Sequence, residues 1–342
     1  MARNLRERKN DTSPRVRIAQ ILMLVLVLAA LCVVWVTRMA HNYVYMFLDH
    51  YDGTTAILAE AKGLQRSESD LEKLLPLQQA FDDWKQTHLR DDVSVTAEDG
   101  AELRGGLYDA GSGVTVVMLH SFDGSSAGSD YLLAPYFAGK GYNILLPDSR
   151  DHGESGGDHV TYGLLEGSDT AAWVRFLLER YGPDHRVILQ GADLGANAAL
   201  TGAALLQGDP DNAGAVAFAA VRAPIENLYD EANYLLKKQF GIPGVVVSLA
   251  DRYARVSLGG HSMGEVSLGE MTAGCTVPIL AIRETGDTVI DPAGAKAFSE
   301  AYAGSCTVLE LTSAHGMGYA ENTAACETAL DDMISACLDG QG

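Results

Sequence analysis

Basic residues are scarce in most of this sequence. The chain of 342 residues holds 25 lysines and arginines against 45 aspartates and glutamates, for a formal net charge of −20. Seven of the basic residues lie within residues 1–40, so residues 41–342, with 18 basic and 43 acidic residues, carry a net charge of −25. So acidic a body argues against nucleic acid as a partner and against adsorption to anionic lipid.

Cysteines are also few. Cys32 lies in an apolar run, and four others lie in the acidic body. Cys326 and Cys337 share a predicted helix, where a rise of about 1.5 Å per residue separates them too far to bond to each other. Cys275 and Cys306 each begin a predicted strand and can pair if these strands are neighbours. Four buried free thiols are the alternative.

The motifs that bind common cofactors are missing. No phosphate loop or dinucleotide fingerprint occurs, because the glycines at 191 and 195 lack the Gly-x-Gly-x-x-Gly spacing. His152 and His159 have no partners at the spacing of metal ligands. We therefore expect no cofactor and no metal.

One long hydrophobic run is present, from Val16 to Val36. It approaches the roughly 20 residues that span a bilayer, and most nearby basic residues precede it. The run is longer than a typical signal-peptide core and no clear cleavage site follows, although a cleaved signal peptide is the alternative. We expect residues 1–40 to form a cytoplasmic N-terminus and an uncleaved single-pass anchor in the cell membrane, with the body on the extracytoplasmic side. Residues 41–90 are predicted to form a linker and helical stalk, broken at Pro76.

Residues 91–342 alternate between predicted strands and helices. Continuous apolar strands are predicted at 114–119, 142–146, 186–190, 215–221, 277–282 and 307–311, with helices between most of them. This alternation predicts an α/β fold with a mostly parallel, doubly wound sheet. Residues at about 223–272 interrupt the pattern and are expected to form a helical cap over the carboxyl ends of the strands.

The stretch from Arg186 to Leu200 organises this pattern. It reads as a buried strand, a tight turn and a helix, with the turn formed by Gly191-Ala-Asp-Leu-Gly195. Glycines let the strand and the helix approach closely at a sharp turn. The pattern is that of a nucleophile elbow, Gly-x-Ser-x-Gly, except that Asp193 stands where serine is expected.

An acid and a histidine follow in the order that this type of site requires. Asp287 follows one predicted strand and His315 follows the next. A histidine on such a loop can act as general base while the carboxylate fixes its tautomer. Asp291 is the rival acid.

The sequence resembles the α/β-hydrolase superfamily over about residues 92–338, in particular membrane-anchored bacterial hydrolases of the BEM46-like and prolyl-oligopeptidase-like groups. His120-Ser121 matches their His-Gly, and the segment from Asp148 to Ser155 matches their Asp-x-Arg-Gly-His-Gly-x-Ser. The resemblance implies an α/β-hydrolase fold, a triad of Asp193, His315 and Asp287, and an oxyanion hole made by the main-chain N–H groups of Phe122 and Leu194.

Three positions depart from the family pattern: Asp193 replaces serine, and Ser121 and Asp151 each replace a glycine. A carboxylate attacks saturated carbon and forms an alkyl ester that a histidine-activated water cleaves. Haloalkane dehalogenases and epoxide hydrolases of the superfamily work in this way. Their usual companions, an aromatic residue after the nucleophile and a His-Gly-x-Pro loop, are absent, since Leu194 follows Asp193.

The sequence thus predicts a hydrolase of a small ester-like, alkyl or epoxide substrate, with two alternatives. One is an inactive homologue that serves as a surface or ligand-binding protein, because a carboxylate at the elbow repels negative charge in the oxyanion hole. The other is a serine esterase built on Ser262, whose Gly-His-Ser-Met-Gly segment matches the elbow motif but lacks a preceding strand and a following helix.

Overall fold

The computed structural model describes the chain except for residues 1–12, 49–65, 123–130, 242–243 and 339–342. One sheet of eight strands runs through the body in the order β1-β2-β4-β3-β5-β6-β7-β8. The pairs β1–β2 and β2–β4 are antiparallel and the others are parallel. The strands are β1 (Asp91–Thr96), β2 (Glu102–Tyr108), β3 (Val114–Leu119), β4 (Asn143–Pro147), β5 (Arg186–Ala192), β6 (Val216–Arg222), β7 (Ile279–Glu284) and β8 (Cys306–Leu311).

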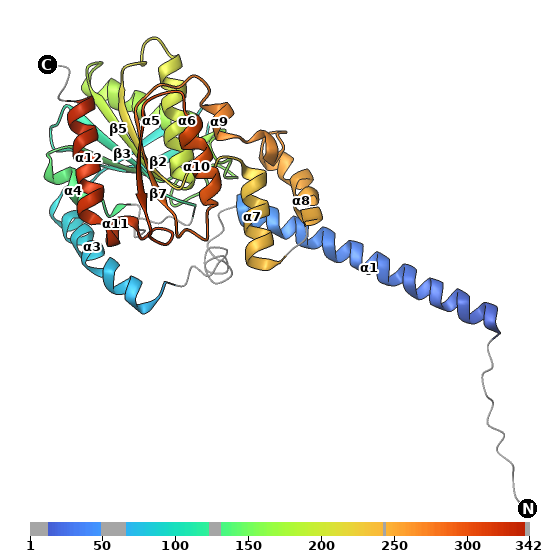
Figure 1. Ribbon diagram of the computed structural model, residues 1–342. Coiled ribbons are helices and arrows are strands. Elements are labelled where there is room, and N and C mark those ends of the chain that lie inside the picture. The colour runs from blue at the N-terminus through green and yellow to red at the C-terminus, as the bar shows by residue number, and fades with distance from the viewer. Residues whose placement is uncertain (1–12, 49–65, 123–130, 242–243, 339–342) are drawn as a thin grey trace, which may run out of the picture.

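Helices cover both faces of this sheet (Figure 1). One face is packed by α5, α6 and α10 through side chains such as Trp173, Leu200 and Phe298, and the other by α3, α4 and α12 through Phe81, Phe137 and Leu330. The helices of the body are α3 (Glu68–Thr87), α4 (Ala134–Gly139), α5 (Glu166–Tyr181), α6 (Leu194–Gly208), α10 (Pro292–Ala301), α11 (Gly318–Glu321) and α12 (Thr323–Cys337). The predicted α/β architecture with a mostly parallel, doubly wound sheet is confirmed.

The segment between β6 and β7 is helical. It contains α7 (Leu228–Phe240), α8 (Gly244–Ser257), the short 3-10 helix η2 (Met263–Glu265) and α9 (Leu268–Met271). These elements pack in one hydrophobic cluster, the core of the cap segment, which contains residues such as Leu235, Val247 and Met263 and extends to Leu194 and Val289 of the body. We refer to residues 223–272 as the cap segment. Its position between two neighbouring strands brings it to the carboxyl ends of the parallel sheet.

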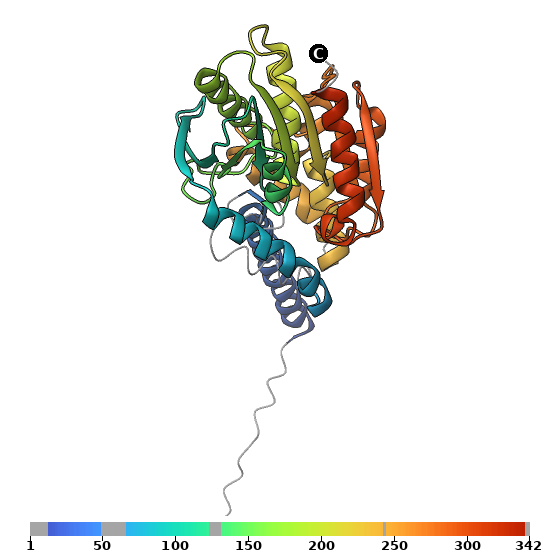
Figure 2. The same cartoon turned by 90° about the vertical axis from the view of Figure 1, so that its left-hand side faces the viewer.

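A long helix, α1 (Pro14–Leu48), leaves the body beside α7 and α8 (Figure 1) and projects away from it in the second view as well (Figure 2). Pro14–Asn42 is long and apolar enough to cross a membrane, and its most apolar window of 18 residues has a mean hydropathy of 2.8. The last turns of α1 pack on α8, where Ala40 and Leu48 are completely buried. The helix therefore joins an apolar outer part to an inner end that belongs to the core of the cap segment.

Pro76 does not break the helical stalk, although the sequence predicted a break there. It lies inside α3, which begins with a capping box between Ser67 and Asp70. Burial of Phe81 and Trp84 against the body stabilises the turns after the proline. Tertiary packing therefore outweighs the backbone hydrogen bond that proline removes.

The cysteines are free thiols in the structure. Cys275 precedes β7 and accepts a hydrogen bond from the Tyr302 hydroxyl at 3.2 Å. Cys306 is the first residue of β8 and pairs with Ile279 of β7. The structure therefore has free thiols, as the second alternative expected, but only Cys275 and Cys326 are buried, whereas Cys306 and Cys337 are half-buried.

Candidate active site

Asp193 lies in the sharp turn between β5 and α6. Its backbone has φ 55°, in the left-handed region that few non-glycine residues adopt. The two flanking glycines are required: a Cβ on Gly191 would lie 2.1 Å from the Gly195 oxygen, and one on Gly195 would lie 2.2 Å from the Leu119 oxygen. The strained turn is therefore imposed by close packing between β3, β5 and α6.

The Asp193 side chain is almost buried, with 6% of the residue exposed. Aspartate before a helix usually accepts a hydrogen bond from the first-turn amides, but Asp193 makes no such capping bond to α6. Since a positive φ is also unfavourable for aspartate, its ordinary structural role does not explain the residue. The N-terminus of α6 still favours a negative charge at this position.

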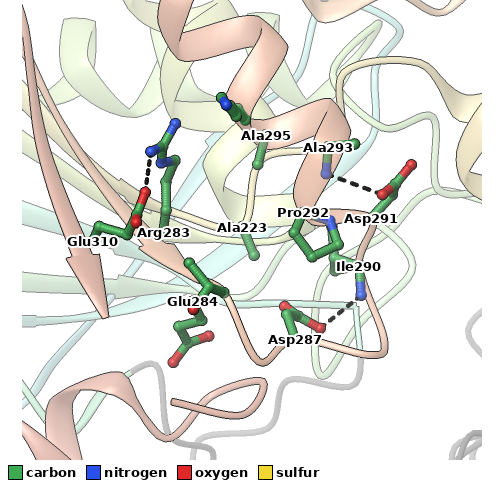
Figure 3. Close-up of a pocket in the computed structure, with 12 residues that line it drawn as sticks. Ala223, Arg283, Glu284, Asp287, Ile290, Asp291, Pro292, Ala293, Ala295 and Glu310 are labelled. Atoms are coloured by element: carbon green, nitrogen blue, oxygen red, sulfur yellow. Dashed lines mark hydrogen bonds and ion pairs between the residues drawn. The ribbon is translucent and has the colours of Figure 1, made fainter. Parts of the chain in front are cut away.

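His315 and Asp287 form a hydrogen-bonded pair next to this turn. His315 Nδ1 lies 2.7 Å from Asp287 Oδ2. The other carboxylate oxygen accepts the backbone N–H groups of Val289 at 2.7 Å and Ile290 at 2.9 Å; the second of these bonds is drawn in Figure 3. Because Asp287 takes three donors, its orientation toward the imidazole is fixed and Nε2 is left as the reactive nitrogen of His315.

The pKa values of the pair move in opposite directions. Burial opposes ionisation of Asp287, but the hydrogen bond and charge of His315 outweigh it and lower the pKa of Asp287. Burial also disfavours protonated His315, but the hydrogen bond and the charge of Asp287 together outweigh it and raise the pKa of His315, with a further contribution from the charge of Asp193. The structure thus brings Asp193, Asp287 and His315 together at the carboxyl ends of β5, β7 and β8.

Asp291, the rival acid, has a different role. Its side chain accepts the N–H of Ala293 at 3.0 Å and caps the start of α10 (Figure 3). Its own N–H donates to Glu231 Oε2 at 3.0 Å. Of the two acids on this loop, Asp287 contacts His315 and Asp291 ends the loop. Figure 3 shows a pocket of about 220 Å³ beside α10, and its lining includes Asp287, Glu284 and Asp291.

The two amides expected to form an oxyanion hole lie at the start of α6 and after β3. Leu194 is the first residue of α6, where backbone N–H groups have no partner within the helix. The carbonyl oxygen of Phe122 lies 2.9 Å from His152 Nε2, and the Phe122 ring stacks on Tyr162. These contacts fix the Phe122 peptide beside the turn.

The family-like histidine motifs are structural. Ser149 N donates to His120 Nε2 at 2.9 Å, and His120 Nδ1 lies 2.8 Å from the Ser121 oxygen. His120 therefore ties the end of β3 to the loop after β4. Asp151, which replaces a glycine of the family pattern, keeps the positive φ of 58° that glycine adopts easily. The His152 ring packs against the His120 ring, whereas His159 is half-buried in the loop that follows.

Ser262 lies in the cap segment and starts η2. Its N–H and its hydroxyl both contact Glu265 Oε2, at 2.6 and 2.8 Å, in a capping box. The serine hydroxyl is thus hydrogen-bonded to a carboxylate, and helix α8 rather than a strand precedes it.

The Asp287–His315 pair and the neighbouring Glu284 together resemble a metal site. Ligand atoms of Glu284, Asp287 and His315 lie within 4.8 Å of one another. However, Glu284 accepts Gly318 N at 2.5 Å, Gly316 N at 2.9 Å and Arg222 at 3.2 Å. A cation would have to displace these donors, so the donor set does not suit a metal.

Sequence reasoning missed Glu284 and Arg222. Both are strand ends: Arg222 closes β6 and Glu284 closes β7. Glu284 holds the loop of His315 through Gly316 and Gly318. A charged residue at the end of each of two adjacent parallel strands was the available signal.

Sequence reasoning also missed Glu231, on α7 of the cap segment. It is 5% exposed. Burial is the main cause that raises the pKa of Glu231 to about 8; the charges of Asp193, Asp291 and Asp287 add to it, and the Asp291 amide opposes it. No local sequence pattern distinguishes this glutamate, because its burial depends on how the cap segment packs.

Comparisons with known proteins agree with this fold. Residues 114–243 match the family model described as alpha/beta hydrolase fold. The uncharacterized protein YqkD of Bacillus subtilis (strain 168) is 26% identical over 188 residues, which cover 54% of this chain and 60% of that protein. The match therefore spans less than two thirds of this relative.

Two solved structures show the same architecture. The esterase Pf2001 of Pyrococcus furiosus is 22% identical with a TM-score of 0.61, covering 75% of this chain and 94% of that one. The α/β hydrolase GrgF from Penicillium sp. sh18 is 16% identical with a TM-score of 0.51, covering 73% and 99%. The chain therefore has the α/β-hydrolase fold.

Proposed function

We propose that this protein is a membrane-anchored hydrolase of a small ester-like, alkyl or epoxide substrate. Asp193 is the nucleophile, His315 the general base and Asp287 the residue that positions His315. The observation that carries the proposal is the arrangement of these groups. Asp193 occupies a strained turn without capping α6, and the Asp287–His315 pair lies close enough for the charge of Asp193 to raise the pKa of His315.

The reaction has two steps. An oxygen of Asp193 attacks a saturated carbon of the substrate, the bond from that carbon to the leaving group breaks, and an alkyl ester forms on Asp193. His315 then removes a proton from water, which attacks the carbonyl carbon of this ester and releases the alcohol product. Asp287 stabilises the imidazolium, and the N–H groups of Phe122 and Leu194 stabilise the oxyanion of the second step. No cofactor takes part in this chemistry.

The alternative is an inactive homologue with a binding role. It is favoured by the low exposure of Asp193 and by the acids around it, since a carboxylate repels the oxyanion of ordinary ester hydrolysis. The narrower likeness to BEM46-like and prolyl-oligopeptidase-like hydrolases also stays a prediction. Only the general α/β-hydrolase framework has support from the relatives.

For the location, we propose that α1 is an uncleaved single-pass anchor in the cell membrane, with its N-terminus cytoplasmic. The inner end of α1 supports this, because Ala40 and Leu48 are buried in the core of the cap segment and Val160 N donates to the Leu48 oxygen at 2.7 Å. His41 also contacts the ring of Tyr253. Cleavage after the apolar run would expose this core. Mass measurement of the mature N-terminus tests the anchor.

The activity is tested with the full chain in detergent micelles on a p-nitrophenyl ester, an aryl epoxide and an alkyl bromide. We expect turnover of the epoxide or the bromide that is lost in both Asp193→Ala and His315→Ala. Turnover of the ester by Asp193→Ser alone would mean that the pair is intact but that the native protein is no esterase. Unchanged ligand binding in His315→Ala without any turnover would favour the binding protein. Labelling of the native protein but not of Ser262→Ala by a serine-directed phosphonate would favour Ser262.

A further inference from the structure

Glu231 has the position of a reacting group rather than of a simple structural acid. It projects from α7 of the cap segment, and its Oε2 accepts the N–H of Asp291, four residues after Asp287. Its other oxygen, Oε1, is buried and has no hydrogen-bond partner among the described residues. Leaving a buried carboxyl oxygen unpartnered is costly, so the group is expected to have a use.

The surroundings of Glu231 favour a neutral carboxylic acid. Acidic groups face it from two elements: Asp193 from the turn after β5, and Asp287 and Asp291 from the loop after β7. The phenol of Tyr162 lies near both Glu231 and Asp193. Tyr162 is buried and keeps its proton, because burial and, to a smaller extent, the charge of Asp193 raise its pKa well above the usual value. A protonated Glu231 has an O–H that can be donated to a substrate atom near Asp193.

Glu231 also borders an opening to solvent. A cavity of about 490 Å³ lies between α7 and α10, and Glu231, Asp291, Tyr234 and Lys237 are among the residues that line it. A small molecule in this cavity can therefore contact Glu231, whose neighbouring charges include that of Asp193.

We propose that Glu231 is a catalytic acid of this site and that the site takes substrates whose leaving atom is oxygen, in particular epoxides. The inference rests on Asp193 acting as the nucleophile. The role depends on where Glu231 lies, in the cap segment and near Asp193. One of its oxygens accepts the N–H of Asp291, and the other has no hydrogen-bond partner in the part of the chain that the structure describes.

The proton balance of the reaction is complete. As an oxygen of Asp193 forms a bond to one epoxide carbon, the bond from that carbon to oxygen breaks and the oxygen takes the proton of Glu231. The products of this step are a hydroxyalkyl ester on Asp193 and a Glu231 carboxylate. Water, deprotonated by His315, then cleaves the ester to a diol and restores Asp193. The proton on His315 returns through solvent to Glu231.

This role separates two kinds of substrate. An epoxide oxygen leaves as an alkoxide unless an acid protonates it, whereas bromide leaves without a proton. Glu231→Gln should therefore lower epoxide turnover by about 100-fold or more and leave alkyl bromide turnover within a few-fold. Glu270→Gln is the control, since Glu270 is an exposed acid of α9 in the cap segment and does not line this cavity, and it should change neither.

The experiment measures kcat and KM of the full chain for an aryl epoxide and an alkyl bromide across pH, in wild type and in both variants. The expected result is a selective loss of epoxide kcat in Glu231→Gln, and a wild-type epoxide kcat that falls as the pH rises above about 8. An equal loss for both substrates would assign Glu231 a structural role and overturn the proposal, as would epoxide turnover that is unchanged in Glu231→Gln. Turnover that survives Asp193→Ala overturns the proposed function instead, and absence of turnover in the wild type overturns both.

Discussion

The stability of the protein should depend on pH through Glu231. In the folded protein, burial and the neighbouring charges of Asp193, Asp291 and Asp287 raise its pKa from an ordinary 4.5 to about 8. The folded state therefore keeps the proton over a range in which the unfolded chain has lost it. Replacement by glutamine keeps the shape of the protonated acid and removes the titration.

The magnitude follows from the two pKa values. The stabilisation by the bound proton is complete below a pH of about 4.5 and is lost as the pH rises through about 8. The full difference corresponds to about 5 kcal/mol of unfolding free energy, of which about 4 kcal/mol falls between about pH 5 and about pH 8.5. Over that interval Glu231→Gln should gain this amount relative to the wild type, while the two proteins have similar stability at the acidic end.

The assay is denaturant unfolding of both proteins in the same detergent, followed by tryptophan fluorescence at several pH values. Titrations shared by both proteins, such as that of His315, cancel in the difference between the two curves. Parallel curves would refute the reasoning, because they would mean that Glu231 ionises in the folded state as it does in the unfolded one.

Three further outcomes follow from the same contacts. Asp287→Asn should lower the pKa of His315, as seen by NMR titration, and reduce turnover by roughly 10³–10⁴-fold, whereas Asp291→Asn, which keeps a capping side chain, should have little effect. Gly191→Ala should lower the free energy of unfolding by more than about 4 kcal/mol, because the new Cβ would lie 2.1 Å from the Gly195 oxygen. The control is Gly208→Ala, whose Cβ meets nothing within 4 Å and which should change this free energy by no more than about 0.5 kcal/mol in the same denaturant assay. Glu284→Gln should leave an N–H of Gly316 or Gly318 unpaired and lower the free energy of unfolding by about 1–3 kcal/mol. It should also change kcat more than KM. An unchanged kcat would mean that Glu284 does not hold His315 in place.

Much of the fold was predictable because its signals are local. The apolar run at 114–119 is a central strand, β3, and the strand, turn and helix around Asp193 follow from their own residues and two glycines. The acid and the histidine were found because parallel strands bring their carboxyl ends together. The choice of Asp287 over Asp291 agrees with the structure in that only Asp287 contacts His315.

The parts that were not predicted depend on packing between distant segments. Pro76 suggested a break, but Phe81 and Trp84 pack α3 on the body through contacts that the helix sequence alone does not reveal. Glu231 is an ordinary glutamate of an amphipathic helix until α7 folds over Asp193. Its raised pKa arises from residues that lie 38 and more positions away in the chain.

The most direct measurement follows heavy oxygen from water during a single turnover. Excess full-length protein reacts once with an aryl epoxide in water labelled with heavy oxygen, and mass spectrometry then reads the product and the peptide that contains Asp193. If Asp193 is the nucleophile, the label enters the Asp193 carboxylate and not the first product, because water attacks the carbonyl carbon of the enzyme ester. Label in the product with an unlabelled Asp193 would contradict the account, since water would then attack the substrate directly.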